Sequence, residues 1–177
     1  NTVSLPLIGI GVIGVKMASD LESSFSKVEN LVGVTGKTLQ GFKDGVKEIS
    51  TEVGKSQSEL AEAVFTITSA GLKGAEAMDL LKSSAKGSVI GLGETKEIAK
   101  AATAIMTAYK DTNITAAQSV NLLAKTVKEG NLEASELAPS IGKILPLAAE
   151  MGITFEEVGA NVATFTRLGI SASEATT

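Results

Sequence analysis

The sequence predicts an all-α protein, a compact array of short amphipathic helices joined by turns that contain glycine. Apolar residues recur at the three- and four-residue spacing of a helix face along most of the chain. Hydrophobic residues make up 44% of the 177 residues but aromatic residues 3%, so Ala, Val, Ile and Leu must fill the core. The alternating runs of β-branched and aromatic residues that are typical of strands are missing.

The chain begins with a strongly apolar, glycine-rich segment, Val3–Val15. It is shorter than the roughly 18 apolar residues that indicate a membrane-spanning helix, and no basic region precedes it as in a signal peptide. We expect this segment to be buried or covered by a partner; the alternative is membrane contact through residues 3–18.

We predict two regions along the chain. Residues 1–36 hold the apolar segment and a first helix, and residues 37–177 form the helical core region. The chain starts without Met and stops just after a new helix opens at Ser171, so we expect a fragment of a longer protein.

Each predicted helix has an apolar face made of residues three or four apart. The faces are Leu21, Phe25, Val28 and Val32; Leu39, Phe42, Val46, Ile49 and Val53; Leu60, Val64 and Ile67; Ala77, Leu81 and Ala85; Ile98, Ala102, Ile105 and Tyr109; Ala116, Val120, Leu123 and Val127; and Phe155, Val158, Val162 and Phe165. Residues 132–151 are also helical in pattern but contain two prolines. We expect Pro139 in a first turn, and we expect Pro146 to kink or split its helix.

One sequence motif recurs between the helices: a glycine, an aliphatic residue, and then a capped helix start. It occurs at Gly71-Leu72, Gly91-Leu92, Gly152-Ile153 and Gly169-Ile170. The glycine can adopt the left-handed conformation that closes a helix. Capping boxes are predicted at Ser56/Glu59, Thr115/Gln118, Thr154/Glu157 and Ser171/Glu174. The spacing between successive copies of this motif is too irregular to predict a solenoid.

The residue types present exclude most catalytic chemistry. The chain has no Cys and no His, which removes disulfides, thiolate and histidine zinc sites, and Ser-His-Asp or Cys-His catalysis. The net charge is −4 without a basic block, so no direct nucleic-acid binding is expected. The carboxylate pairs Glu156-Glu157 and Glu133 with Glu136 are interpreted as helix caps. We therefore predict a protein that is not an enzyme, with no catalytic, cofactor-binding or metal residues.

Two further patterns are interpreted as local structure. Gly91–Gly93 followed by Glu94 looks like a phosphate loop but lacks the G-x-x-x-x-G-K-[ST] pattern. Asp111–Asn113 lacks the glycine and the final glutamate of a calcium loop, so we predict a turn. Tyr109 lies on an apolar helix face, which favours core packing over a catalytic phenol.

Two stretches, Ser69–Ala77 and Leu147–Ala175, carry a likeness to a known family. With the helix between Glu94 and Tyr109, the segment at Pro146 and the apolar start, they resemble the core region of phage tail tape-measure proteins of the TP901 type. The likeness covers most of the chain. It is a pattern of whole segments, so no site residue is carried over from it.

This resemblance implies a structural component of a phage or prophage tail, part of the tape measure that sets tail length and assists assembly and genome delivery. It implies a place in the interior of the tail tube, after synthesis in the bacterial host cytoplasm. The partners it implies are further copies of the chain and tail tube, tail chaperone or baseplate proteins. Because the helices are short and broken by glycine, we expect a compact module instead of an extended rod. The alternatives are a membrane-interacting segment that acts during genome delivery and a bacterial helical interaction module.

Overall fold

The computed structural model describes residues 8–176, and over that range it is helical and contains no strand. The elements are α1 (Ile8–Val32), α2 (Gly36–Val53), α3 (Gln57–Ser69), α4 (Gly74–Val89), α5 (Thr95–Ala108), the short 3-10 helix η1 (Lys110–Thr112), α6 (Ala116–Gly130), α7 (Ala134–Glu150), α8 (Phe155–Arg167) and α9 (Ala172–Ala175). The all-α prediction is confirmed. The first part of the apolar start lies outside the described residues, and the rest of it continues into α1.

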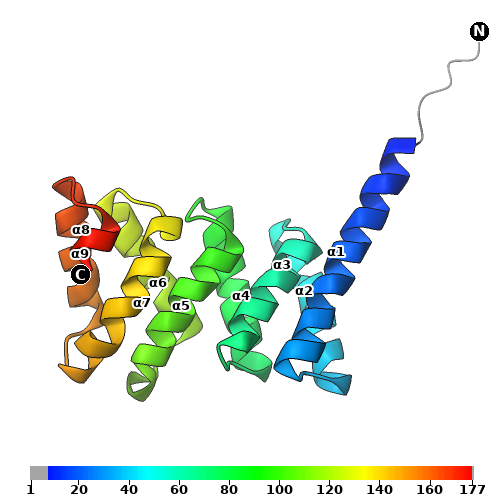
Figure 1. Cartoon of the computed structure of the whole chain (residues 1–177), viewed down its shortest axis with the longest axis horizontal. Coiled ribbons are helices and arrows are strands. Elements are labelled where there is room, and N and C mark those ends of the chain that lie inside the picture. The colour runs from blue at the N-terminus through cyan, green and yellow to red at the C-terminus, as the bar shows by residue number, and fades with distance from the viewer. Residues whose placement is uncertain (1–7, 177) are drawn as a thin grey trace, which may run out of the picture.

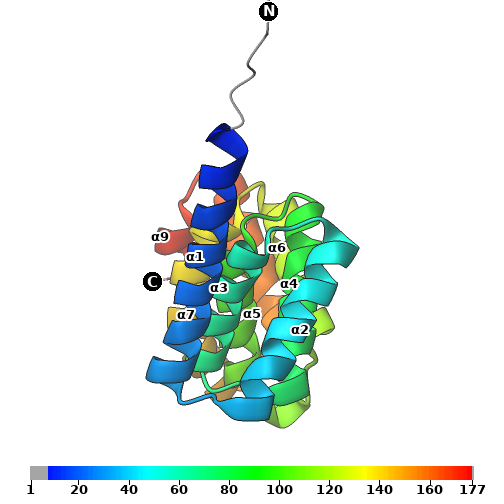
Figure 2. The same cartoon turned by 90° about the vertical axis from the view of Figure 1, so that its right-hand side faces the viewer.

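The helices alternate between two layers. Helices α1, α3, α5, α7 and α9 pack side by side in one layer, and α2, α4, α6 and α8 pack side by side in the other. Figure 1 shows the resulting row, and Figure 2 looks along it, with the two layers on either side. Each helix also contacts the next one in the chain. The molecule is therefore a stack of antiparallel helical hairpins, which we call the array.

The turns of the array recur at nearly regular intervals along the chain. On one rim, Gly33, Gly71, Asn113 and Gly152 have positive φ and lie 38, 42 and 39 positions apart; on the other rim, Gly54, Gly91, Asn131 and Gly169 lie 37, 40 and 38 positions apart. The spacing is thus regular, contrary to the sequence-based expectation. The glycine pattern missed the repeat because asparagine, which also tolerates the left-handed conformation, replaces glycine at two of the eight positions.

At four of the eight turns, the residue after the left-handed position closes the helix end. The Leu92, Leu132, Ile153 and Ile170 amides donate to carbonyl oxygens five residues back at 3.1, 3.2, 2.9 and 3.1 Å. This bond satisfies a carbonyl that the helix end leaves free. The recurring motif at Gly91, Gly152 and Gly169 is therefore a helix stop of the Schellman type.

Three of the four predicted capping boxes are confirmed, at Thr115, Thr154 and Ser171. The prediction at Ser56 is half right. Ser56 accepts the Glu59 amide at 3.1 Å, but the Glu59 carboxylate does not reach back. It accepts instead from the Thr95 hydroxyl of α5 at 2.6 Å, so a contact with the next hairpin replaces the local one.

The predicted place of Pro139 in a first turn was wrong, and so was the alternative in which Pro146 splits its helix. α7 is one continuous helix from Ala134 to Glu150, and Pro139 is its sixth residue instead of part of its first turn. Pro146 does not split it. The two prolines are seven residues apart and both are exposed, while Leu137 and Leu145 face the core.

The hydrophobic core runs between the two layers for the length of the array. Its largest fully buried side chains are Val28, Val46, Leu60, Ile67, Leu80, Leu81, Ile98, Ile105, Leu123, Leu137, Ile141 and Leu145. Phe165 was predicted on the apolar face of its helix but is 43% exposed. The division of the chain after residue 36 stays a prediction.

Candidate functional site

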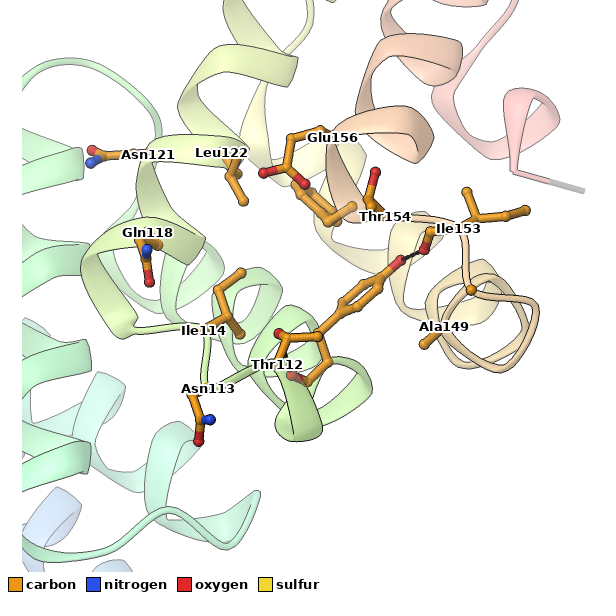
Figure 3. Close-up of a pocket in the computed structure, with 13 residues that line it drawn as sticks. Thr112, Asn113, Ile114, Gln118, Asn121, Leu122, Ala149, Ile153, Thr154 and Glu156 are labelled. Carbon is orange, nitrogen blue, oxygen red and sulfur yellow. Dashed lines mark hydrogen bonds between the residues drawn. The ribbon is translucent and has the colours of Figure 1, made fainter.

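Grooves recur along both rims, between the turns of successive hairpins. The most apolar of them, of about 500 Å³, lies between the η1 turn, the start of α6 and the α7–α8 turn (Figure 3). A second groove lies on the opposite rim, between the α4–α5 and α6–α7 turns. Because the grooves repeat with the hairpins, their existence follows from the architecture.

Tyr109 forms the floor of the first groove. Its side chain is buried, as the sequence predicts, and its hydroxyl donates to the Ile153 carbonyl oxygen at 2.9 Å (Figure 3). Its ring meets Phe155 edge to face, with 6.4 Å between the ring centroids. Burial, followed by the nearby Glu156 and Glu157 carboxylates, raises the pKa of Tyr109 above its ordinary value of 10.0. The phenol thus stays neutral and ties two hairpins together.

The polar groups around Tyr109 are engaged in local structure. Thr112 donates to the Tyr109 carbonyl oxygen at 2.7 Å, which closes the turn predicted at Asp111–Asn113. Gln118 and Thr154 belong to capping boxes. The described groove therefore offers apolar surface with a polar edge, and it pairs no nucleophile with a base.

One carboxylate of each predicted pair, Glu157 and Glu136, acts as a helix cap. The Glu157 carboxylate accepts from the Thr154 amide at 2.9 Å, and Glu136 accepts from the Glu133 amide at 3.0 Å. The Thr154 amide and then its hydroxyl hold the pKa of Glu157 below its usual range. A general acid needs the opposite shift.

The glycine-rich turn Gly91–Gly93 links α4 to α5 and lies beside acidic side chains. Glu59, Glu62 and Glu94 line the groove beside it. The two lysines there are already paired, Lys55 with Glu59 at 3.4 Å and Lys96 with Glu62 at 3.9 Å. A phosphate group would meet more negative than positive charge at this turn.

Side-chain hydrogen bonds join successive hairpins in the described structure. Three side-chain hydrogen bonds among residues 18–176, whose side chains the structure describes, span more than thirty positions: Thr95 to Glu59, Tyr109 to Ile153, and Thr166 to the Gly130 carbonyl oxygen at 3.0 Å. Each joins one hairpin to the next along a rim, so these bonds fix how successive repeats stack.

Glycines inside helices permit close contacts in the layer of even-numbered helices. Gly159 of α8 lies against the Thr126 hydroxyl of α6, and a methyl group at Gly159 would overlap it. A Cβ at Gly130 would lie 3.2 Å from the Ala163 Cα. Sequence reasoning did not single out these two glycines, because nothing local distinguishes them from other helical glycines.

Two searches bear on other kinds of site. Within the described part of the chain, no group of three or more Asp and Glu side chains could hold a metal ion. No helix among residues 8–176 combines the length and apolar character needed to cross a membrane.

The hairpins repeat along the chain and contact one another through specific hydrogen bonds. This arrangement defines the class of helical-repeat proteins. The family model for the phage-related minor tail protein matches residues 43–177, and the chain belongs to that family. The chain is 24% identical over all of its 177 residues to the tape measure protein of Pneumococcus phage Dp-1, and covers 15% of that protein. It is 26% identical over 159 residues, 87% of the chain, to the probable tape measure protein of Clostridium phage phiCD119, of which it covers 17%. No solved structure matches the chain.

These matches confirm the resemblance to phage tail tape measure proteins and a structural role in a phage tail. The alternatives, a membrane-acting segment and a bacterial interaction module, are not favoured. The chain spans about one sixth of the length of the relatives it matches.

Proposed function

We propose that the array is one compact segment of the ruler that sets tail length. The observation that carries this proposal is the folding of the chain into antiparallel hairpins, because it sets how much length each residue can add. About 40 residues as one extended helix would span about 60 Å at 1.5 Å per residue. The same residues as a hairpin in the array add one helix-to-helix spacing, about 8–10 Å.

The experiment is a change in the number of repeats. Residues 72–113 form one repeat that ends at a left-handed residue, and deleting them places Ile114 after Gly71, where Leu72 stood. The matched variants carry one, two or three extra copies of the same repeat. Tail length is measured by electron cryo-microscopy of the assembled particles.

We expect tail length to rise with repeat number by about 8–10 Å per repeat if the array keeps its hairpins in the tail. A slope of about 60 Å would mean that the chain extends into a single helix there. Unchanged length across the series would remove the ruler role from this segment.

The proposal includes the location and partners of the segment. It lies in the interior of the tail tube after synthesis in the host cytoplasm, and it meets further copies of itself and tail tube, chaperone or baseplate proteins. The rim grooves and the exposed side chains Val89 and Ile90 support a protein-binding surface. The chain acts without catalysis, and it divides after residue 36 into a first region, residues 1–36, and the helical core region, residues 37–177. A protease that cuts within residues 33–36 and leaves residues 37–177 folded would support that division.

A further inference from the structure

The end of the array at α8 carries apolar side chains that no described residue covers. Leu168 is 74% exposed, and Phe165 and Ile170 lie beside it in sequence at 43% and 38%. Leu147 on α7, in the other layer, is 59% exposed. Figure 1 shows α7, α8 and α9 together at this end of the row, which we call the end face.

The repeat shows what these positions do in the preceding hairpin. The helix caps Thr115 and Thr154 are 39 positions apart, so Phe165 of α8 corresponds to Thr126 of α6. Thr126 is 4% exposed because α8 packs on it through Gly159. Phe165 thus occupies the position through which an even-numbered helix receives its next neighbour, and it has no neighbour there.

The odd-numbered layer also ends in an apolar side chain at a position that is more covered in the preceding hairpin. The first residues of α5 and α7, Thr95 and Ala134, are also 39 positions apart, so Leu147 corresponds to Ala108. Ala108 packs against the core and is only partly exposed. α9 contacts α7 and α8 but is four residues long. It takes the next place in the odd-numbered layer and leaves Leu147, near the far end of α7, uncovered.

We propose that the end face is the docking surface for one further helical hairpin of the same array, supplied by the polypeptide that follows residue 177 in the whole tape measure protein. The relatives provide ample chain for it, since this segment covers 15% and 17% of them. The large apolar side chains at Phe165 and Leu147 carry the inference, not the position of the last residue. It does not depend on the ruler role proposed above.

The test uses cysteine labelling, because the 177 residues contain no Cys. Leu147 and Val89 are a matched pair: each lies in the last turn of its helix, and they are 59% and 55% exposed. Val89 keeps this exposure although the hairpins on both sides of it are present. Leu147→Cys and Val89→Cys are made in the whole protein and in the 177-residue chain, and maleimide labelling is read by mass spectrometry on the peptide that carries the introduced cysteine. Phe165→Cys is the second variant on the end face.

In the 177-residue chain we expect Leu147→Cys and Val89→Cys to react at similar rates. In the whole protein we expect Leu147→Cys and Phe165→Cys to react at least about tenfold more slowly than Val89→Cys, at every protein concentration, because the docked hairpin must open first. Equal rates at residues 147 and 89 in the whole protein would overturn the proposal. Protection that disappears on dilution would also overturn it, because the occupant would then be a second copy.

Discussion

The two layers of the array pack by different means. In the even-numbered layer each crossing contains a helical glycine against the next helix: Gly45 against Met78, Gly87 against Val120, and Gly159 against Thr126. In the odd-numbered layer, Gly142 of α7 has nothing nearer than the Ala104 Cβ at 3.8 Å, an ordinary contact. Buried alanines such as Ala99 and Ala102 fill α5 there instead.

This difference shows that one repeat can be stacked by two kinds of interface. A glycine inside a helix costs roughly 0.5–1 kcal/mol relative to alanine, so its use at each even-layer crossing implies a compensating close contact. Methyl groups in the other layer keep full helix propensity and fill the space between helices. Substitutions at small residues should therefore have opposite signs in the two layers.

The largest expected effect tests whether the two layers share one core. Ile105→Ala in α5 and Leu123→Ala in α6 each remove a fully buried side chain, one from each layer. We expect both to lower the free energy of unfolding by about 2–5 kcal/mol, because each leaves a cavity. Urea unfolding followed by circular dichroism measures it, with the exposed Leu31→Ala as control. A much smaller loss in one layer would mean that its helices are separately and more weakly packed.

The second effect concerns the glycine contact between α6 and α8. Gly159→Ala should cost about 1–3 kcal/mol, because the new methyl group overlaps the stiff, buried Thr126 side chain. Thr126→Ala removes the overlapping hydroxyl, so the double variant should recover most of the loss. A double-mutant cycle in urea measures the coupling. Additive losses would show that the contact does not limit how closely these helices approach.

The third effect concerns the rim bond of the odd-numbered layer. Tyr109→Phe removes the hydroxyl that donates to Ile153 and should cost about 0.5–1.5 kcal/mol. Thermal unfolding measures the change. Thr166→Val tests the corresponding bond to Gly130 on the other rim. No loss in either variant would mean that apolar packing alone sets the stacking.

The ionisation of Tyr109 gives a separate measurement of the same bond. Because burial raises its pKa above 10.0, its contribution to stability is complete below pH 10 and is lost as the pH rises through the folded-state pKa. The chain has one Tyr and no Trp, so the absorbance of tyrosinate reports this group alone. We expect the titration to move down towards pH 10 when urea is added. Identical titrations in both states would contradict a buried phenol.

The smallest effect has the opposite sign. Gly142→Ala in α7 meets only the Ala104 methyl group at ordinary contact distance, so it should stabilise the protein by up to about 1 kcal/mol through helix propensity. Gly41→Ala in α2, with nothing within 4 Å, is the matched surface control. Destabilisation at Gly142 with a gain at Gly41 would show that the odd-numbered layer also depends on close glycine contacts.

Much of the fold could be predicted because its signals are local. Three of four capping boxes and the helix stops at Gly71, Gly91, Gly152 and Gly169 were found from the sequence, since each depends on residues within one turn. The carboxylates at Glu136 and Glu157 were assigned to caps for the same reason. The groove around Tyr109 could not be found, because it joins turns 40 residues apart.

The sequence by itself determined the helices, their ends and the apolar face of each, because backbone capping and side-chain periodicity act over a few residues. Only the tertiary structure decided that odd and even helices form separate layers, that Glu59 serves Thr95 instead of its own cap, and that Phe165 lies on an uncovered end. Those outcomes depend on which helix meets which, and close packing between distant segments sets that choice.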